Sequence, residues 1–176
     1  MKSIVFPGFF LILILLLSCN SSTDQSRERN PDPSSMKEPL LYANKQAVKE
    51  ENEQIERFIK RYKWQMKETG SGLRYDIYFK GNGIKAEAGK LAVLKYSVRL
   101  IDGIEIYSSD KTGLKQFVIG HGGVEGGLEE GILLLSVGDR AKFILPSHLG
   151  FGLLGDQDKV PPKSTLIYDL ELIELK

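Results

Sequence analysis

The feature that most constrains this chain is a switch of its apolar pattern to a period of two, which begins after Gly70-Ser71-Gly72. In residues 73–80 and again in residues 94–100, apolar and polar side chains alternate, and the turn Gly81-Asn82-Gly83 follows the first segment. Such alternation is typical of strands that bury one face and expose the other. The predicted strands are residues 73–80, 94–100, 116–119, 141–145 and 166–175.

Only one helix is predicted among these strands. Leu128, Ile132 and Leu135 fit a short helix within residues 127–135, which is too short for the crossover that joins parallel strands. The strands are therefore expected to pair in the antiparallel sense. The predicted fold class is α+β, with a twisted antiparallel β-sheet wrapped around one short α-helix.

An amphipathic helix is predicted before the sheet, in residues 40–63. This segment is rich in Lys, Glu and Gln, and its sparse apolar residues include a series spaced by seven. The neighbouring seam holds Asn44 and Glu51 before Phe58, so only the C-terminal half has a continuous apolar stripe. We therefore expect the helix to dock its end on the following domain, and a coiled-coil dimer is the alternative. The series is Leu41, Val48, Ile55 and Tyr62.

The first residues are typical of an export signal. Lys2 gives a positive charge, and residues 4–17 are an apolar stretch that is too short to span a bilayer. Leu16-Leu17-Ser18-Cys19 resembles the bacterial lipobox, and Cys19 is the only cysteine of the chain. The resemblance implies that residues 1–18 are a removed signal peptide and that Cys19 carries a lipid; a membrane anchor with an incidental cysteine is the alternative. Residues 19–39, rich in Ser, Asn, Asp and Pro, are predicted to be a disordered tether.

Composition and spacing argue against several other function classes. The 24 basic and 23 acidic residues nearly cancel, so the chain lacks the positive charge expected of a nucleic-acid-binding protein. With one cysteine and two histidines, neither a zinc site nor thiol chemistry is expected. The glycines of residues 120–127 do not follow the dinucleotide-binding pattern, because Glu125 takes a required glycine position. Asp156 and Asp158 resemble an incomplete cation loop, but solvated turn residues are the stronger interpretation.

Ordered motifs across the C-terminal half carry a more specific signal. In order and spacing, residues 73–176 resemble the FKBP-type peptidyl-prolyl cis–trans isomerases. The complete design, with its lipobox, is also similar to the gliding-motility-associated FKBP-type lipoproteins of Bacteroidota. The motifs are Asp102-Gly103, Ser108-Ser109, Gly127-Leu128-Glu129-Glu130-Gly131, Ser136-Val137-Gly138-Asp139-Arg140-Ala141-Lys142, Gly150-Phe151-Gly152 and Val160-Pro161-Pro162.

The resemblance implies an FKBP-like domain in residues 64–176, with an aromatic-walled pocket at one rim of the sheet. It also implies a chemistry without nucleophile, metal, cofactor or covalent intermediate. Rotation about an X–Pro bond loses amide resonance, against a barrier of about 18–20 kcal/mol. A dry apolar pocket favours the twisted amide, because its charge separation is smaller than that of the planar amide.

Matching the family's pocket position by position implies ten substrate-binding residues. Tyr96 and Tyr168 correspond to the pocket aromatics of two strands, and Phe117 corresponds to an aromatic wall. Val124 and Val160 correspond to aliphatic residues at the helix start and on a loop lip. The ten residues are Tyr96, Ile106, Tyr107, Phe117, Val124, Glu125, Leu128, Phe151, Val160 and Tyr168.

Five of these positions depart from the residues that the family usually carries. Leu128 stands where many members have Trp, and Ile106 replaces Phe. Tyr107 replaces an Asp that accepts hydrogen bonds at the pocket edge in the family. Glu125 brings a charged side chain to the position whose backbone N–H binds substrate, and Phe151 lacks the hydroxyl of the usual Tyr.

The resemblance implies a peptidyl-prolyl isomerase of the cell envelope that assists the folding or assembly of exported proteins. Its expected partners are proline-containing segments of those proteins and, through the lipid on Cys19, a membrane. Asn20 is not the Asp that retains lipoproteins at the inner membrane, which favours the outer membrane and a domain that faces the periplasm. The departures leave open a non-catalytic chaperone or binding module with a degenerate site, or a structural lipoprotein of a motility or secretion assembly. The oligomeric state is not indicated by the sequence.

Overall fold

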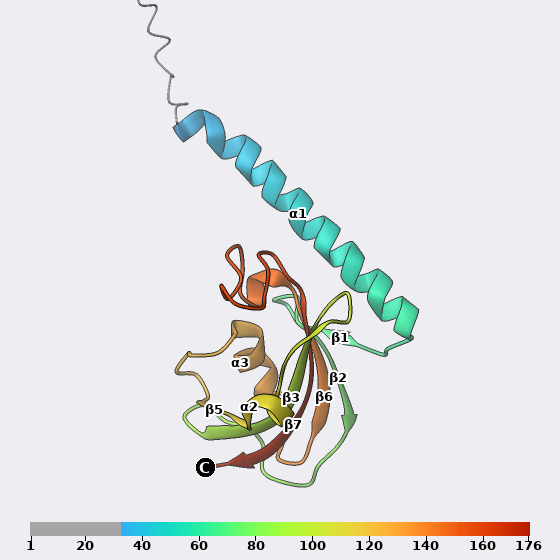
Figure 1. Cartoon of the computed structure of the whole chain (residues 1–176), viewed down its shortest axis with the longest axis vertical. Coiled ribbons are helices and arrows are strands. Elements are labelled where there is room, and N and C mark those ends of the chain that lie inside the picture. The colour runs from blue at the N-terminus through green and yellow to red at the C-terminus, as the bar shows by residue number, and fades with distance from the viewer. Residues whose placement is uncertain (1–32) are drawn as a thin grey trace, which may run out of the picture. The chain divides into compact units, whose positions relative to one another are not determined.

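The computed structural model describes residues 33–176, with side chains from residue 37 onward. Residues 1–39 and 40–176 are two separate units, and the fold and the candidate site belong to the second (Figure 1). The predicted signal peptide, Cys19 and residues 19–32 of the predicted tether lie outside the described residues. None of the described helices is long and apolar enough to cross a membrane.

The long helix α1 (Pro33–Tyr62) begins earlier than the sequence indicated. A start at residue 40 was expected, so residues 33–39 of the predicted tether are helical instead. Pro33 suits the first position of a helix, because its fixed φ is helical and its missing N–H would have no partner there. Pro39 lies inside the helix rather than before it. The helix continues through Pro39 because the Lys-, Glu-, Gln- and Ala-rich segment that follows strongly favours helix.

The sheet is antiparallel throughout, which confirms the predicted α+β class. Its strand order is β1-β2-β6-β7-β3-β4, and β5 pairs with β3 beside this path. The short helix α3 (Gly126–Ile132) packs on the sheet as predicted. The remaining elements are β1 (Lys67–Glu68), β2 (Arg74–Phe79), β3 (Leu91–Leu100), β4 (Glu105–Ser108), α2 (Ser109–Thr112), β5 (Lys115–Val118), β6 (Arg140–Leu145), the 3-10 helix η1 (Ser147–Leu149) and β7 (Leu166–Leu175).

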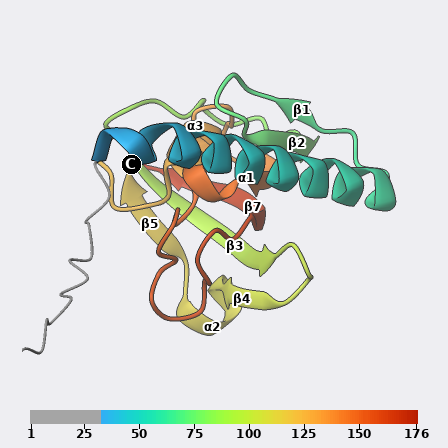
Figure 2. The ribbon, with the colours of Figure 1, turned by 90° about the horizontal axis from the view of Figure 1, so that it is seen from above.

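Both faces of the sheet are covered, each by a different helix. Successive side chains of a strand point to opposite faces. On β6, Phe143 belongs to the main core with Leu128 of α3, whereas the adjacent Ile144 packs with Ile55 of α1. Ile167 of β7 joins this second cluster. The two helices therefore lie on opposite faces, as Figure 1 shows, and Figure 2 shows α1 running across the domain. The prediction that α1 docks on the domain is confirmed.

One predicted strand face was only partly right. On β2, Tyr75 and Ile77 pack against the main core, but Phe79 at the end of the strand is 53% exposed. Arg74, expected to face solvent, is 5% exposed. Its guanidinium lies 3.3 Å from Glu56 of α1 and 3.2 Å from Glu68 of β1. Because α1 and β1 cover the start of β2, Arg74 is buried, whereas Tyr78 on the same face is 47% exposed.

Two glycines allow α3 to lie unusually close to the sheet. A Cβ on Gly127 would come within 2.6 Å of Leu145, and a Cβ on Gly131 would overlap the ring of Phe143. The helix can therefore rest on β6 with backbone-to-side-chain contact. This close packing fixes the N-terminus of α3, and with it the side chains of Val124 and Glu125.

Candidate functional site

The ten predicted pocket residues lie in or beside the main hydrophobic core. Nine of them belong to a single hydrophobic cluster, and Glu125 joins it through a hydrogen bond with Tyr168. We name the buried members the floor of the candidate site and the half-buried members its rim. The floor comprises Ile106, Phe117, Glu125, Leu128, Val160 and Tyr168, and the rim comprises Tyr96, Tyr107, Val124 and Phe151.

Two tyrosines on neighbouring strands form the aromatic part of the site. Tyr96 of β3 and Tyr168 of β7 have ring centroids 6.4 Å apart, with their planes tilted by 31°. The strand register pairs Tyr168 with Val98, two residues from Tyr96, which puts both tyrosines on the same face of the sheet. The Tyr96 hydroxyl lies 2.9 Å from the hydroxyl of Thr112 at the end of α2. Both rings are thus held in place by the sheet and its neighbouring turn.

Glu125 lies in the floor with its side chain only 3% exposed. Its Oε1 atom accepts a hydrogen bond of 2.6 Å from the Tyr168 hydroxyl. Burial, followed by the nearby Glu125 carboxylate, raises the pKa of Tyr168 well above its usual value, so this hydroxyl stays protonated and donates. The sequence identified Glu125 by its backbone N–H, but it did not indicate that the carboxylate would turn inward.

Lys115 is a site residue that the sequence analysis missed. Its Nζ atom lies 3.4 Å from Glu125 Oε2 and 5.5 Å and 6.0 Å from the ring centroids of Tyr96 and Tyr168. The ammonium group therefore pairs with the buried carboxylate and contacts two aromatic faces. Lys115 is two residues from Phe117 on β5, so the alternation of a strand could have placed both side chains on the same face.

Asp156 is the second residue that the sequence did not assign to the site. Its carboxylate accepts a hydrogen bond from the Tyr107 hydroxyl, and Oδ1 accepts the backbone N–H groups of Val160 and Asp158 at 2.7 Å and 3.0 Å. The hydrogen bond to Asp156, together with burial, raises the pKa of Tyr107. Partial burial acts to raise the pKa of Asp156, but the hydrogen bonds from Tyr107 and the backbone outweigh it, and this pKa is lowered. Tyr107 replaces the Asp that the family usually carries, but its hydroxyl binds the carboxylate of Asp156. A carboxylate is therefore still present beside this position.

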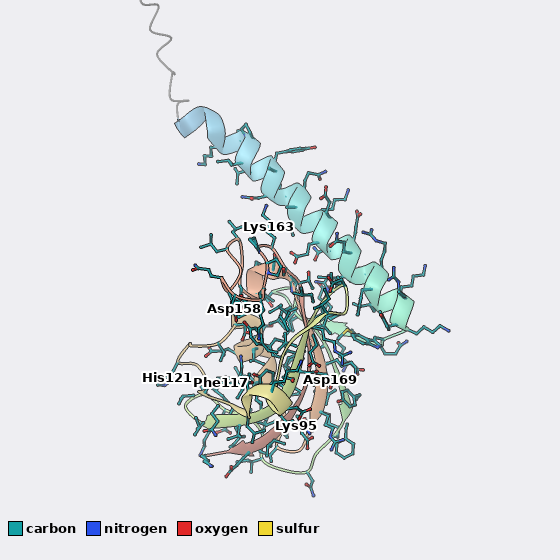
Figure 3. The ribbon with its side chains drawn as sticks, in the orientation of Figure 1. Lys95, Phe117, His121, Asp158, Lys163 and Asp169 are labelled. Atoms are coloured by element: carbon teal, nitrogen blue, oxygen red, sulfur yellow. The ribbon has the colours of Figure 1, made fainter. Side chains whose placement is uncertain are left out.

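The segment between β6 and β7 supplies three residues of the site. We name residues 147–165 the rim loop; it carries Phe151, Asp156 and Val160. Figure 3 labels Asp158 in this loop and Phe117 on β5. Phe151 is half-buried against the main core and has no hydroxyl to offer to a ligand.

The arrangement suits noncovalent binding of an apolar segment. An aromatic and aliphatic cluster has a half-buried rim, and its buried polar groups are paired with one another. Among residues 33–176, the structure brings together no group of three or more His, Cys, Asp and Glu side chains that could hold a metal ion. The site can exclude water from a bound peptide bond and contact it through aromatic faces.

Both the sequence and the fold of this chain are similar to those of known proteins. The sequence profile described as "FKBP-type peptidyl-prolyl cis-trans isomerase" matches residues 82–173. A probable FKBP-type peptidyl-prolyl cis-trans isomerase FkpA of Neisseria meningitidis is 34% identical over 110 residues, which cover 62% of this chain. FK506-binding protein 2 of Dictyostelium discoideum is 38% identical over 91 residues, which cover 51% of this chain and 68% of that protein.

A solved structure extends the likeness to three dimensions. The crystal structure of FkpA from Escherichia coli matches with a TM-score of 0.65 and 27% sequence identity, over 82% of this chain and 73% of the other. The FKBP-like fold predicted from the sequence is therefore confirmed. The chain spans only 40% of the length of the Neisseria meningitidis relative and 41% of an FkpA of Aeromonas hydrophila.

Proposed function

This chain belongs to the family of FKBP-type peptidyl-prolyl cis–trans isomerases, and from that premise we propose that it accelerates rotation about X–Pro peptide bonds. The observation that supports the proposal is that nine of the ten predicted residues lie in the main hydrophobic core, where Tyr96 packs beside Tyr168. Binding there would hold a proline and its preceding residue against the faces of Tyr96 and Tyr168.

The proposed catalysis is differential binding of the twisted amide. A planar amide has more charge separation than a twisted one, so transfer into an apolar site costs the ground state more than the transition state. Each ~1.4 kcal/mol by which the site stabilises the transition state more than the ground state raises the rate tenfold. The half-buried Phe151 and Val124 would exclude water on either side of the bond, and no group needs to give or take a proton.

We further propose that the protein works in the bacterial cell envelope as a lipoprotein that faces the periplasm. Support comes from the sequence, in Lys2, the apolar residues 4–17 and the lipobox that ends at Cys19, with the outer membrane favoured by Asn20. The FkpA relatives of Neisseria meningitidis and Aeromonas hydrophila are bacterial as well. Proline-containing segments of exported proteins are the proposed substrates, and the likeness to gliding-motility-associated lipoproteins makes a motility assembly one proposed setting.

A specific observation favours a second candidate function, that of a non-catalytic binding module. The Glu125 carboxylate and the Lys115 ammonium lie 3.4 Å apart beside the aromatic rings. Charges so near the site make it more polar than a pocket that acts by desolvation requires. Such a site would still hold an apolar–Pro segment without lowering the barrier to rotation.

A peptide isomerisation assay separates the two functions. The protein beginning at Met36 is expected to accelerate cis-to-trans conversion of a Leu-Pro tetrapeptide above the rate in buffer. Phe151→Tyr should raise the rate several-fold, because a hydroxyl on the rim adds one hydrogen bond of about 1 kcal/mol to the substrate. Leu153→Ala, at a 67% exposed position of the same loop, is the matched control and should change nothing.

A rate equal to that in buffer, combined with peptide binding seen by calorimetry, would favour the binding module. If Phe151→Tyr were active but no faster than the native protein, the proposed orientation of substrate at the rim would be wrong.

A further inference from the structure

We propose that Glu51 of α1 is a positioning residue for this site, because its carboxylate ties together the two ends of the rim loop. Glu51 Oε1 accepts the backbone N–H of Ser147 at 2.6 Å and the hydroxyl of Thr165 at 2.7 Å. Its Oε2 accepts the Ser147 hydroxyl at 2.9 Å. Ser147 and Thr165 are the first and last residues of the rim loop, so a single side chain of α1 joins both of its ends, next to the last β6–β7 pair at Leu145 and Leu166.

These hydrogen bonds are of the strong kind. A carboxylate that accepts from a backbone N–H and two hydroxyls makes charge-assisted bonds, which are shorter and stronger than neutral ones. Thr165 is 4% exposed, and Glu51 and Ser147 are half-buried, so water competes poorly for the same groups. The closure therefore restricts the loop that carries Phe151, Asp156 and Val160.

The helix that carries Glu51 is itself fixed to the strands on either side of the loop. Ile55, one turn further along α1, is fully buried against Ile144 of β6 and Ile167 of β7. Residues four apart lie on the same face of a helix, so Glu51 and Ile55 meet the same edge of the domain. Ile144 and Ile167 lie just outside the loop ends, at 147 and 165. The apolar contact of Ile55 thus fixes the position of the Glu51 carboxylate, and this carboxylate restricts the rim loop.

Glu51 accepts no hydrogen bond from a residue of the pocket floor or rim, so it would act only through the loop. Glu56 offers a matched control on the same helix. Its carboxylate also joins α1 to the sheet, 3.3 Å from Arg74, but it makes no contact with the rim loop. A role in general helix docking would be shared by Glu51 and Glu56, whereas a role in loop positioning would belong to Glu51 alone.

Hydrogen exchange of the full chain in mild detergent tests the inference directly. The backbone N–H groups of Gly152, Val160 and Lys163 are hydrogen-bonded within the loop and report on its closure. Glu51→Gln is expected to speed their exchange by roughly tenfold, which corresponds to about 1.4 kcal/mol of lost local stability. Glu56→Gln should leave these three amides unchanged, and the β6 amides should be unchanged in both variants.

Thr165→Val provides a second, nearly isosteric test that leaves Glu51 in place. It removes one of the three hydrogen bonds, so we expect faster exchange at the same three amides, by a smaller factor. Combined with Glu51→Gln, it should add little more, because both changes remove the same interaction. Exchange at native rates in Glu51→Gln, or equal acceleration in Glu56→Gln, would overturn the proposal.

The consequence for catalysis rests on the proposed isomerase function. If that function holds, Glu51→Gln should raise KM for a Leu-Pro peptide by roughly threefold or more while kcat changes less, because the loop contributes to substrate binding. If the native protein has no isomerase activity, the exchange experiment still decides whether Glu51 positions the loop. The failure of one proposal is thus distinguishable from the failure of the other.

Discussion

Two carboxylates, Glu125 and Asp156, lie at the candidate site, and each accepts a hydrogen bond from a tyrosine. Burying a carboxylate is costly unless its charge and lone pairs find partners. Glu125 has Tyr168 and Lys115 as partners, and Asp156 has Tyr107 and two backbone N–H groups. Glu125 therefore changes the polarity of the floor, whereas Asp156 mainly organises the rim loop.

The charge pair in the floor should limit the rate of isomerisation. Replacing both partners together, with Glu125→Leu and Lys115→Met, removes the charge pair without leaving an unpaired buried charge, and the Tyr168 hydroxyl loses its acceptor. We expect kcat/KM for a Leu-Pro peptide to rise by about tenfold, the factor that corresponds to about 1.4 kcal/mol of transition-state stabilisation. The measurement is the isomerisation rate at several enzyme concentrations.

Lys115→Met alone is the informative control, because it leaves the Glu125 carboxylate without its cation. It should lower the melting temperature more than the double variant does. A double variant that is stably folded but no faster than the native protein would show that the charge pair does not limit catalysis.

The Tyr107–Asp156 pair should make stability depend on pH in the acid range. The pKa of Asp156 is lower in the folded protein than in the unfolded chain, where aspartate has a pKa of about 3.9. Its contribution is therefore present above pH ~4 and is lost as the pH falls through the lowered folded pKa. Asp156→Asn should lower the melting temperature at pH 7, and the difference from the native protein should shrink below pH ~4.

Asp158→Asn is the matched control, since the Asp158 carboxylate is 3.4 Å from the Tyr107 hydroxyl and largely exposed. When both variants are measured from pH 3 to pH 7, it should lower the melting temperature at pH 7 less than Asp156→Asn does. If the difference in melting temperature between Asp156→Asn and the native protein stayed constant from pH 3 to pH 7, the lowered pKa of Asp156 would be contradicted.

Sequence reasoning predicted ten site positions but not the partners of their polar side chains. The ten residues could be named because the order and spacing of the motifs resemble those of the family; nine lie in the main core, and Glu125 contacts it through Tyr168. Lys115 and Asp156 were missed because their roles depend on which partner each charge meets across the fold. No local sequence pattern indicates that Tyr107 of β4 and Asp156 of the rim loop form a hydrogen bond.

At the scale of elements, the docking of α1 depends on one of the four apolar residues that are spaced seven apart. Ile55 is fully buried, whereas Leu41, Val48 and Tyr62 are about half exposed. Ile55→Ala should lower the free energy of unfolding by about 3 kcal/mol, the usual cost of removing a large buried aliphatic side chain. Val48→Ala, two turns earlier in the same series, should change it by less than about 0.5 kcal/mol.

Urea unfolding followed by the fluorescence of Trp64 is a suitable measurement. Trp64 is the only tryptophan, and it packs beside this cluster with Phe58. Equal losses for the two variants would mean that α1 is held by its whole length rather than by this contact.

The strands illustrate what periodicity can and cannot predict. β7 matched its predicted range, and β2 and β6 matched theirs to within one residue, because their alternation is long and clear. β1 and β4 were not predicted, and β1 has only two residues, too few to show alternation. The burial of Arg74 could not be read from β2 itself, because it depends on a helix that lies earlier in the chain.

At the scale of the whole molecule, the family profile begins at residue 82, but the packed unit begins near residue 40. The additional residues cover the second face of the sheet through Ile55 and meet the rim loop through Glu51. A pocket on one face and a helix on the other are therefore linked by the loop between β6 and β7. This link gives the N-terminal helix a part in the site that the profile region alone would not contain.

A pair of truncations tests this view of the molecule. Removal of residues 1–63 would expose Ile144 and Ile167 and would leave Arg74 without Glu56. At about 1.5–3 kcal/mol for each aliphatic side chain that is fully uncovered, the free energy of unfolding should fall by roughly 4 kcal/mol. Removal of residues 1–39, which leaves the packed unit complete, should cost little. The midpoints of urea unfolding measure both, and equal midpoints would mean that α1 contributes nothing to the stability of the sheet it covers.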